Sequence, residues 1–171
     1  MALRPGRTVK RLKRPYTRIS KKKPRKSYVV GVPYPRIHIF EMGKKGKFKA
    51  TLYLTATESA QIRDNALEAA RVVASKYLQK KLGKDGYFMK ILVYPHQVLR
   101  EHSIATGAGA DRYSQGMAHA FGRPAGIAVR AKAGQRLIMV RTKKVSLTIA
   151  KEALKRAASK LSTKTRIEVE E

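Results

Sequence analysis

Residues 50–94 have the sequence ATLYLTATESAQIRDNALEAARVVASKYLQKKLGKDGYFMKILVY, and they decide the fold because two strand patterns flank a helix pattern. Leu52 and Leu54 recur at every second position, which is typical of a half-buried strand. Residues 87–94 are rich in aromatic and β-branched side chains and stop at Pro95, which indicates a second, buried strand. The order strand, helix, strand therefore predicts a mixed fold.

The segment between these strands has the signals of an amphipathic helix. Thr55 stands three residues before Glu58, the spacing of a capping box at a helix start. Gly83 is well placed to end the helix, because glycine accepts the left-handed conformation common at helix ends. The apolar stripe expected to face the core consists of Ile62, Ala66, Ala69, Val73 and Tyr77.

The C-terminal third repeats this order. Residues 136–141 predict a strand, Ser146 is the expected helix cap, and residues 165–169 predict a closing strand. The second apolar stripe consists of Leu147, Ala150, Leu154, Ala157 and Leu161. The repeated order is compatible with an internal repeat or with none, because residue identity between the two units is slight.

Two further strand patterns complete the expected sheet. Residues 127–131 are expected to pair with residues 136–141 through a turn at Ala133 and Gly134. Residues 37–40 alternate in polarity and lead from a connector into a short strand. Together the elements predict an α+β fold, a two-layer α/β sandwich with two helices packed on a mainly antiparallel sheet.

The charge of the chain is strongly unbalanced. Its 171 residues include 39 Lys and Arg against 11 Asp and Glu, a formal net charge of +28 at pH 7. Such a surplus repels itself and predicts a polyanionic partner, while 43% hydrophobic residues allow a folded core. No cysteine is present, which excludes disulfides and thiolate zinc sites. With no long apolar run and no apolar signal stretch, we expect a soluble intracellular protein with no membrane partner.

The first 26 residues hold twelve basic side chains and no acid, and Pro5, Pro15 and Pro24 interrupt any continuous helix. We therefore assign residues 1–27 to a basic RNA-binding N-terminal arm and residues 28–171 to a single α/β domain. A solvated, disordered tail is the alternative. The candidate RNA-binding residues of the arm are Arg4, Arg7, Lys10, Arg11, Lys13, Arg14, Tyr16, Arg18, Lys21, Lys22, Lys23, Arg25 and Lys26.

A long glycine-rich loop separates the strand that ends near Val98 from the one that begins near Ile127. Residues 106–110 (TGAGA) have little side chain to pack, so we expect a loop at about residues 101–116 to be mobile without a partner. In residues 116–126 (GMAHAFGRPAG), glycines permit close backbone approach, while charged and aromatic side chains suit RNA.

Nucleotide and metal sites are poorly supported. Gly107 and Gly109 are followed neither by a third glycine nor by the Lys-Ser/Thr ending of a phosphate-binding loop. His96, His102 and His119 are not spaced to lie on one helical face. We expect no metal and no cofactor.

Catalytic carboxylates are equally poorly supported. Glu101 and Asp111 lie in the loop region beside Arg100 and Arg112, so local ion pairing is a simpler interpretation than an acid/base pair. No nucleophile has a credible base beside it. The acids expected on the solvated faces of the helices are Glu58, Asp64, Glu68 and Glu152. The sequence therefore predicts no enzyme activity.

Four segments resemble a known family. RPGR at 4–7, ALEAAR at 66–71, GAGADR at 107–112 and above all GMAHAFGRPAG at 116–126 are similar to the universal large-subunit ribosomal protein family L-sixteen, in its archaeal and eukaryotic L-ten-e form. The resemblance covers essentially the whole chain. Abundant lysine without cysteine favours the archaeal branch.

The resemblance implies a cytoplasmic ribosomal protein, not a homo-oligomer, that binds 23S rRNA near the central protuberance, in the vicinity of 5S rRNA and of neighbouring large-subunit proteins. It also implies a loop near the peptidyl transferase centre that helps position A-site and P-site tRNA, with the residues His102, Gly107, Gly109, Asp111, Arg112 and Gln115. The implied RNA-facing residues are Met117, His119, Phe121 and Arg123. A basic architectural nucleic-acid-binding protein and a ribosome assembly factor are the alternatives.

Overall fold

The computed structural model describes residues 3–13, 29–105, 107–114, 116–118 and 120–170. In chain order its elements are α1 (Arg7–Lys10), β1 (Glu41–Gly43), β2 (Ala50–Ala56), β3 (Ala60–Arg63), α2 (Asp64–Leu82), β4 (Tyr87–Ile91), β5 (Gln97–Glu101), η1 (Ala110–Arg112), β6 (Arg123–Ala131), β7 (Arg136–Thr142), η2 (Lys144–Ser146), α3 (Leu147–Ala158) and β8 (Thr165–Glu170).

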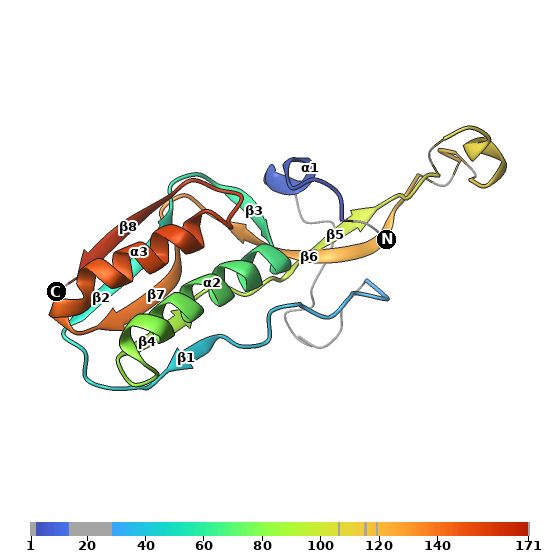
Figure 1. Ribbon diagram of the computed structural model, residues 1–171. Coiled ribbons are helices and arrows are strands. Elements are labelled where there is room, and N and C mark those ends of the chain that lie inside the picture. Colours follow the sequence, from blue (N-terminus) through green and yellow to red (C-terminus); the bar gives the residue numbers. More distant parts are fainter. Residues whose placement is uncertain (1–2, 14–28, 106, 115, 119, 171) are drawn as a thin grey trace, which may run out of the picture.

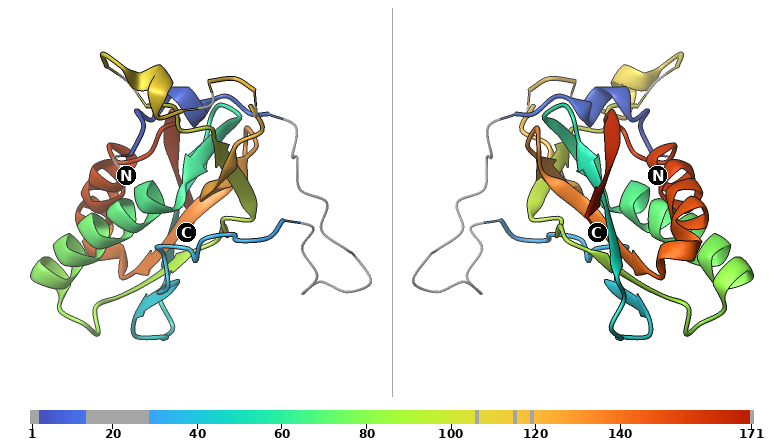
Figure 2. Two further views of the ribbon diagram at one scale, coloured as in Figure 1. Left: turned by 90° about the vertical axis from the view of Figure 1, so that its right-hand side faces the viewer. Right: turned by 90° about the vertical axis from the view of Figure 1, so that its left-hand side faces the viewer.

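Two antiparallel sheets form within these ranges. The larger has the strand order β1-β4-β7-β2-β8, and the smaller has the order β3-β6-β5. Helices α2 and α3 lie side by side and cover one face of the larger sheet (Figures 1 and 2). The expected α+β class, with two helices packed on a mainly antiparallel sheet, is therefore confirmed.

The core lies between the two helices and the larger sheet. Burial of each large aliphatic side chain there contributes roughly 1.5–3 kcal/mol relative to exposure. Gly83 ends α2 as expected, with φ +71° and its N–H donating to the carbonyl of Gln79 at 3.0 Å. The largest buried side chains include Leu52, Leu54, Leu67, Leu78, Met89, Leu137, Ile138, Val140 and Leu154.

The expected pairing of residues 127–131 with residues 136–141 is wrong. Strand β6 pairs with β3 and β5, whereas β7 pairs with β2 and β4. The turn at Gly134 does not fold the chain back, because the Gly134 N–H donates to the carbonyl of Ala56 at 2.8 Å, and the Ala56 N–H donates to the carbonyl of Gln135 at 2.9 Å. The chain turns a corner there and passes from one sheet into the other.

The corner is shared by two antiparallel segments. Thr55 lies opposite Arg136 on the larger sheet, and Ala60 lies opposite Ala131 on the smaller one. The same number of residues separates these partners on each segment, so the register continues across the corner. On one side of the corner β2 pairs with β7 in the larger sheet, and on the other side β3 pairs with β6 in the smaller sheet. The smaller sheet is thereby directed away from the core.

The expected start of the first helix is also wrong. Thr55 lies in β2, and α2 begins at Asp64, after the unexpected strand β3. The Asp64 carboxylate accepts the N–H of Asn65 at 2.8 Å and that of Arg36 at 2.9 Å. A negative charge at this position is favourable beside the positive end of the helix dipole. Asp64 is therefore buried, and not on a solvated face as expected.

The face of α2 that meets the sheet is displaced by one residue from the expected stripe. Leu67, Ala70, Ala74 and Leu78 are buried, whereas Tyr77 is half-buried and lies beneath the Arg156 guanidinium of α3 at 4.2 Å. The apolar arc of α2 is wide because it packs on both the sheet and α3. The stripe expected for α3 is buried at Ala150, Leu154 and Ala157, and Ser146 holds the N-cap position without a side-chain capping bond.

Candidate nucleic-acid interface

Strands β5 and β6 form an antiparallel hairpin that carries the long loop away from the body. Val98 lies opposite Ile127, and Glu101 lies opposite Arg123, so the loop proper comprises residues 102–122. Figure 1 shows this loop, in yellow, at one extreme of the molecule, far from the two helices. The smaller sheet thus supports a projection that contributes little to the core.

The point where the hairpin opens into the loop requires a glycine at position 122. A Cβ atom on Gly122 would lie 2.6 Å from the Glu101 carbonyl carbon and 2.8 Å from the backbone nitrogen of His102. These distances are shorter than side-chain contacts allow. The glycines of the motif at residues 116–126 were expected to permit close backbone approach, and at Gly122 the approach occurs between the two strands of the hairpin.

The loop has its own internal hydrogen bonds. His102 Nε2 lies 2.8 Å from the carbonyl oxygen of Gly116. Because a carbonyl only accepts, this ring nitrogen must carry the proton. The Ser114 hydroxyl donates to the carbonyl of Ala110 at 3.1 Å and closes the turn of η1. His102 therefore joins the two sides of the loop, and Gly107 and Gly109 both have positive φ angles near its tip.

Large apolar side chains are exposed along this projection. The exposed fractions are 88% for Tyr113, 75% for Phe121 and 67% for Met117. The Arg100 guanidinium lies 3.6 Å from the centroid of the Phe121 ring, a cation–π contact that covers one face of the ring. Exposed aromatic faces beside arginines are the surfaces on which unpaired bases stack.

The described part of the arm packs on the smaller sheet at the base of the hairpin. Gln61, in β3, is 2% exposed, and its Nε2 donates to the carbonyls of Val9 at 3.1 Å and Arg11 at 2.7 Å. The Arg63 guanidinium donates to the carbonyl of Arg4 at 2.6 Å. These three bonds go to main-chain atoms, so they fix the path of the described part of the arm and leave the side chains of Arg7, Arg11 and Lys13 exposed.

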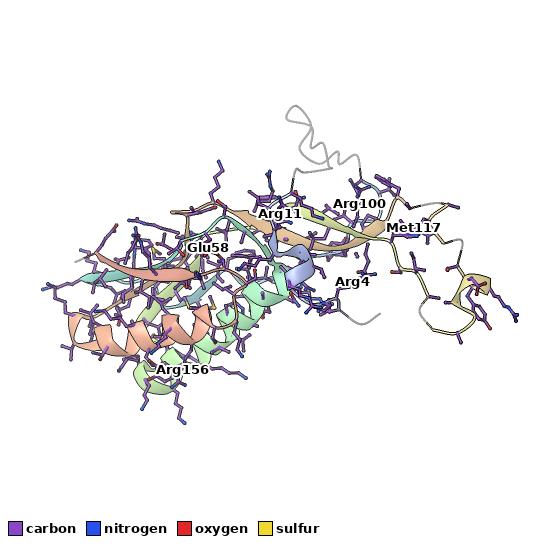
Figure 3. All side chains as sticks on the ribbon, turned by 90° about the horizontal axis from the view of Figure 1, so that it is seen from above. Arg4, Arg11, Glu58, Arg100, Met117 and Arg156 are labelled. Atoms are coloured by element: carbon purple, nitrogen blue, oxygen red, sulfur yellow. The ribbon has the colours of Figure 1, made fainter. Side chains whose placement is uncertain are left out.

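Arg4 also joins the arm to the hairpin. Its Nε donates to the Glu101 carboxylate at 2.5 Å, directly before the loop begins. Figure 3 shows Arg4, Arg11 and Arg100 on the hairpin half of the molecule, with Met117 farther out along the projection. The described part of the arm, residues 3–13, and the hairpin that carries the loop thus lie at the same end of the protein.

The site residues expected from the sequence differ in their exposure, and some lie outside the described residues. Arg7, Lys13, Asp111, Arg112 and Arg123 are surface side chains at this end. Lys10, half-buried, lies 3.9 Å from Glu58. The residues Arg14, Tyr16, Arg18, Lys21, Lys22, Lys23, Arg25, Lys26, Gln115 and His119 lie outside the described residues.

Three residues that contribute to this arrangement were not expected from the sequence. Gln61 and Arg63 hold the arm, and Arg100 supports the Phe121 ring. No local pattern identifies Gln61 or Arg63, because their partners lie 50 or more positions away. Glu101 was expected to pair locally, and the structure shows it bound to Arg4, 97 positions away.

The described residues contain no group of three or more His, Cys, Asp or Glu side chains able to hold a metal ion. His96 packs against the Tyr94 ring, with 4.6 Å between ring centroids, and His102 is engaged with Gly116. Among the helices that the structure describes, none is long and apolar enough to cross a membrane.

Comparison with known proteins gives a consistent result. The family model described as "Ribosomal protein L16p/L10e" matches residues 15–168. A protein of Archaeoglobus fulgidus is 50% identical over 171 residues, covering 99% of this chain and 94% of the relative. Proteins of Sulfolobus acidocaldarius and Caldivirga maquilingensis are 47% and 45% identical, each covering 99% of this chain and 94% and 95% of the relative. All three are named "Large ribosomal subunit protein uL16".

Proposed function

The chain belongs to the L16p/L10e family of ribosomal proteins, and from this we propose that it binds rRNA as a structural constituent of the large subunit of the cytoplasmic ribosome. As a member of this family it is a structural component of the ribosome and not an enzyme. Its role is in translation, and its relatives in this comparison are archaeal. The rRNA supplies the negative charge that a chain of net charge +28 requires.

The finer proposal concerns the place of each region. The arm, residues 1–27, and the body bind 23S rRNA near the base of the central protuberance, in the vicinity of 5S rRNA and beside neighbouring large-subunit proteins. The loop at about residues 101–116 extends toward the peptidyl transferase centre, where it helps position the tRNAs of the A and P sites. The single observation that supports this proposal is the hairpin, which projects from the body with exposed aromatic and basic side chains at its end.

The chemistry of the hairpin suits contact with RNA. Arg100 holds the largely exposed ring of Phe121 through a cation–π contact, so a base that stacks on this ring meets an aromatic surface held by a cation. The exposed guanidinium groups of Arg112 and Arg123 offer paired donors to phosphate oxygens. Contacts of these kinds position RNA more than they read its sequence. The protein therefore shapes the surroundings of the tRNAs, and the peptidyl transfer chemistry belongs to the RNA.

Purified large subunits provide the first test. After a salt wash, the protein should be present at one copy per subunit, and removing it should expose rRNA nucleotides near the tRNA sites to chemical probes. A chain that appears only in immature particles would instead be an assembly factor. Tighter binding to duplex DNA than to folded rRNA would favour the architectural alternative.

Three variants separate the arm from the loop. A chain that begins at residue 27 should bind rRNA with a shallower dependence on salt, because each lost phosphate contact lowers the slope by about 0.9. Shortening residues 106–110, or changing Arg112→Ser, should leave the melting temperature nearly unchanged while impairing tRNA handling. An unchanged slope would show that the arm makes no phosphate contact, and a large loss of stability would show that the loop belongs to the core.

A further inference from the structure

A second basic surface lies at the end of the body opposite the hairpin. Three turns lie next to one another there, around the fully buried Thr142 at the end of β7. Thr142 pairs with Ala50 of β2 on one side and with Tyr87 of β4 on the other, so the turns that adjoin these three residues are neighbours. The Thr142 hydroxyl donates to the carbonyl of Gly86 at 3.3 Å. The turns comprise residues 43–50, 80–87 and 141–147, and we call their combined surface the distal surface. Figure 1 shows them at the opposite end from the yellow loop.

The distal surface is rich in lysine. Its basic residues are Lys44, Lys45, Lys47, Lys49, Lys80, Lys81, Lys84, Arg141, Lys143 and Lys144. The nearby acids that the structure describes are already engaged: Glu41 with Lys45 and Lys90, Asp85 with Lys44, and Glu170 with Arg136. Lys47, Lys84 and Lys143, one from each turn, are exposed and make no ion pair with any described residue.

The ion pairs of the fold use only part of this charge. Lys44 and Lys45 have acidic partners, whereas Lys47, Lys84 and Lys143 repel one another and pair with no acid among the described residues. A groove of about 530 Å³ opens between the β1 turn and the end of α2, lined in part by Lys44, Lys84, Ser75 and Gln79. A surface of this kind fits a linear polyanion that several lysines contact at once.

The side chains of the distal surface differ in kind from those of the hairpin end. Of its ten cations nine are lysines, whereas the described cations around the hairpin are mainly arginines, including Arg4, Arg63, Arg100, Arg112 and Arg123. Lysine acts as a hydrated point charge, while arginine makes directional, paired and stacking contacts. The two aromatics of the three turns, all of which the structure describes, are the half-buried Phe48 and the buried Tyr87. No exposed ring is therefore available there for base stacking.

We propose that the distal surface is a second RNA-binding site, which contacts the phosphate backbone of an rRNA helix other than the RNA held by the arm and the hairpin. This inference rests on the proposed function, because it takes rRNA as the partner. It adds that the protein bridges two RNA segments from its two ends. The distal contact is electrostatic and independent of sequence, whereas the hairpin end makes directional contacts.

The test uses the full chain and large-subunit rRNA transcribed in vitro. The first variant carries Lys47→Gln, Lys84→Gln and Lys143→Gln. The matched control carries the same changes at Lys132, Lys155 and Lys164, which are also exposed but lie outside the three turns. Affinity is measured over a range of salt concentrations, and rRNA protection is mapped by hydroxyl-radical cleavage. The distal variant should have a slope shallower by roughly 2 to 3, and the control should retain the slope of the native chain.

The protection pattern gives an independent readout. The distal variant should lose protection of one rRNA helix and retain the nucleotides protected by the hairpin, whereas Arg112→Ser should show the reverse. Equal effects of the distal and control changes would overturn the inference while leaving the proposed function intact. A distal variant that binds rRNA normally but is lost from salt-washed subunits would assign the surface to an acidic protein and overturn it too. Failure of the native chain to bind the rRNA would instead refute the proposed function.

Discussion

Replacing Gln61 by leucine should release the arm without unfolding the body. The Gln61 amide donates two hydrogen bonds to the arm, to the carbonyls of Val9 and Arg11, and leucine has a similar volume and no donor. Each such bond contributes about 0.5–1.5 kcal/mol net, so the docked arm should lose about 1–3 kcal/mol. This corresponds to a shift of roughly 5- to 150-fold toward the undocked state.

The body should not lose stability in the same variant. Gln61 Oε1 is buried and has no hydrogen-bond partner among the described residues, so its removal relieves a desolvation cost of about 1–3 kcal/mol. The released carbonyls of Val9 and Arg11 regain water once the arm leaves. The denaturation midpoint should therefore stay the same or rise slightly, although contacts to the arm are lost.

Amide hydrogen exchange measures the two effects separately. The N–H groups of Thr8 and Val9 bond to the carbonyls of Pro5 and Gly6 within the arm, and these amides should exchange faster in Gln61→Leu. Peptides from β3 and β6 should keep their protection. The control is Gln135→Leu, which removes a half-buried glutamine at the corner of the sheets, away from the arm, whose Oε1 accepts the Lys132 N–H at 3.0 Å. Unchanged exchange in residues 3–13, or faster exchange throughout β3 and β6, would refute the reasoning.

Three further changes probe the hairpin and the charges. Gly122→Ala should destabilise the protein by about 1–3 kcal/mol in chemical denaturation, because its Cβ would meet the Glu101 backbone, whereas Gly126→Ala, with open space around it, should not. Phe121→Ala should weaken RNA binding by roughly 5- to 150-fold at an unchanged melting temperature, since stacking on one ring contributes about 1–3 kcal/mol, and Val30→Ala serves as the exposed control. Bonds from Lys45 and then Lys90 lower the pKa of Glu41 to about 2, so its contribution to stability is full above its unfolded pKa near 4.5 and is lost as the pH falls toward 2. Carboxyl titration by NMR should return this pKa toward 4.5 in the double variant Lys45→Gln, Lys90→Gln, and a pKa that stays low would contradict the assignment.

Local periodicity predicted the elements whose neighbours are close in sequence. Strand β7, helix α3 and strand β8 lie within a residue or a few of their expected bounds, because their apolar residues recur at the period of the element. The end of α2 at Gly83 follows from the conformation that only glycine adopts easily. Each of these signals depends only on residues within or next to one element, so the sequence alone is enough to predict it.

The pairing of strands and the docking of the arm could not be predicted from local sequence patterns. Nothing in residues 131–136 distinguishes a hairpin turn from a corner, since the outcome depends on hydrogen bonds from Ala56, almost 80 positions away. The spacing of Thr55 and Glu58 matched a capping box, yet the chain continues as β2 and β3 because partners for both strands exist. For the interface, the sequence indicated the arm and the loop as RNA-binding regions. That contacts of Gln61, Arg63 and Glu101 bring them together could be seen only in the folded structure.

The few acids of this chain explain how so much positive charge is organised. Glu101 fixes Arg4, Glu41 fixes two lysines, and the pKa of Glu168 is lowered by Arg166 and by Arg136 beside it. Surface pairs of this kind contribute little to stability, typically below about 1 kcal/mol. Their effect is to hold particular cations, and with them the arm and the sheet edge, in defined positions. Other exposed cations, among them Lys47, Lys84 and Lys143, make no ion pair with an acid that the structure describes, so the charge needed to offset them must come from a partner.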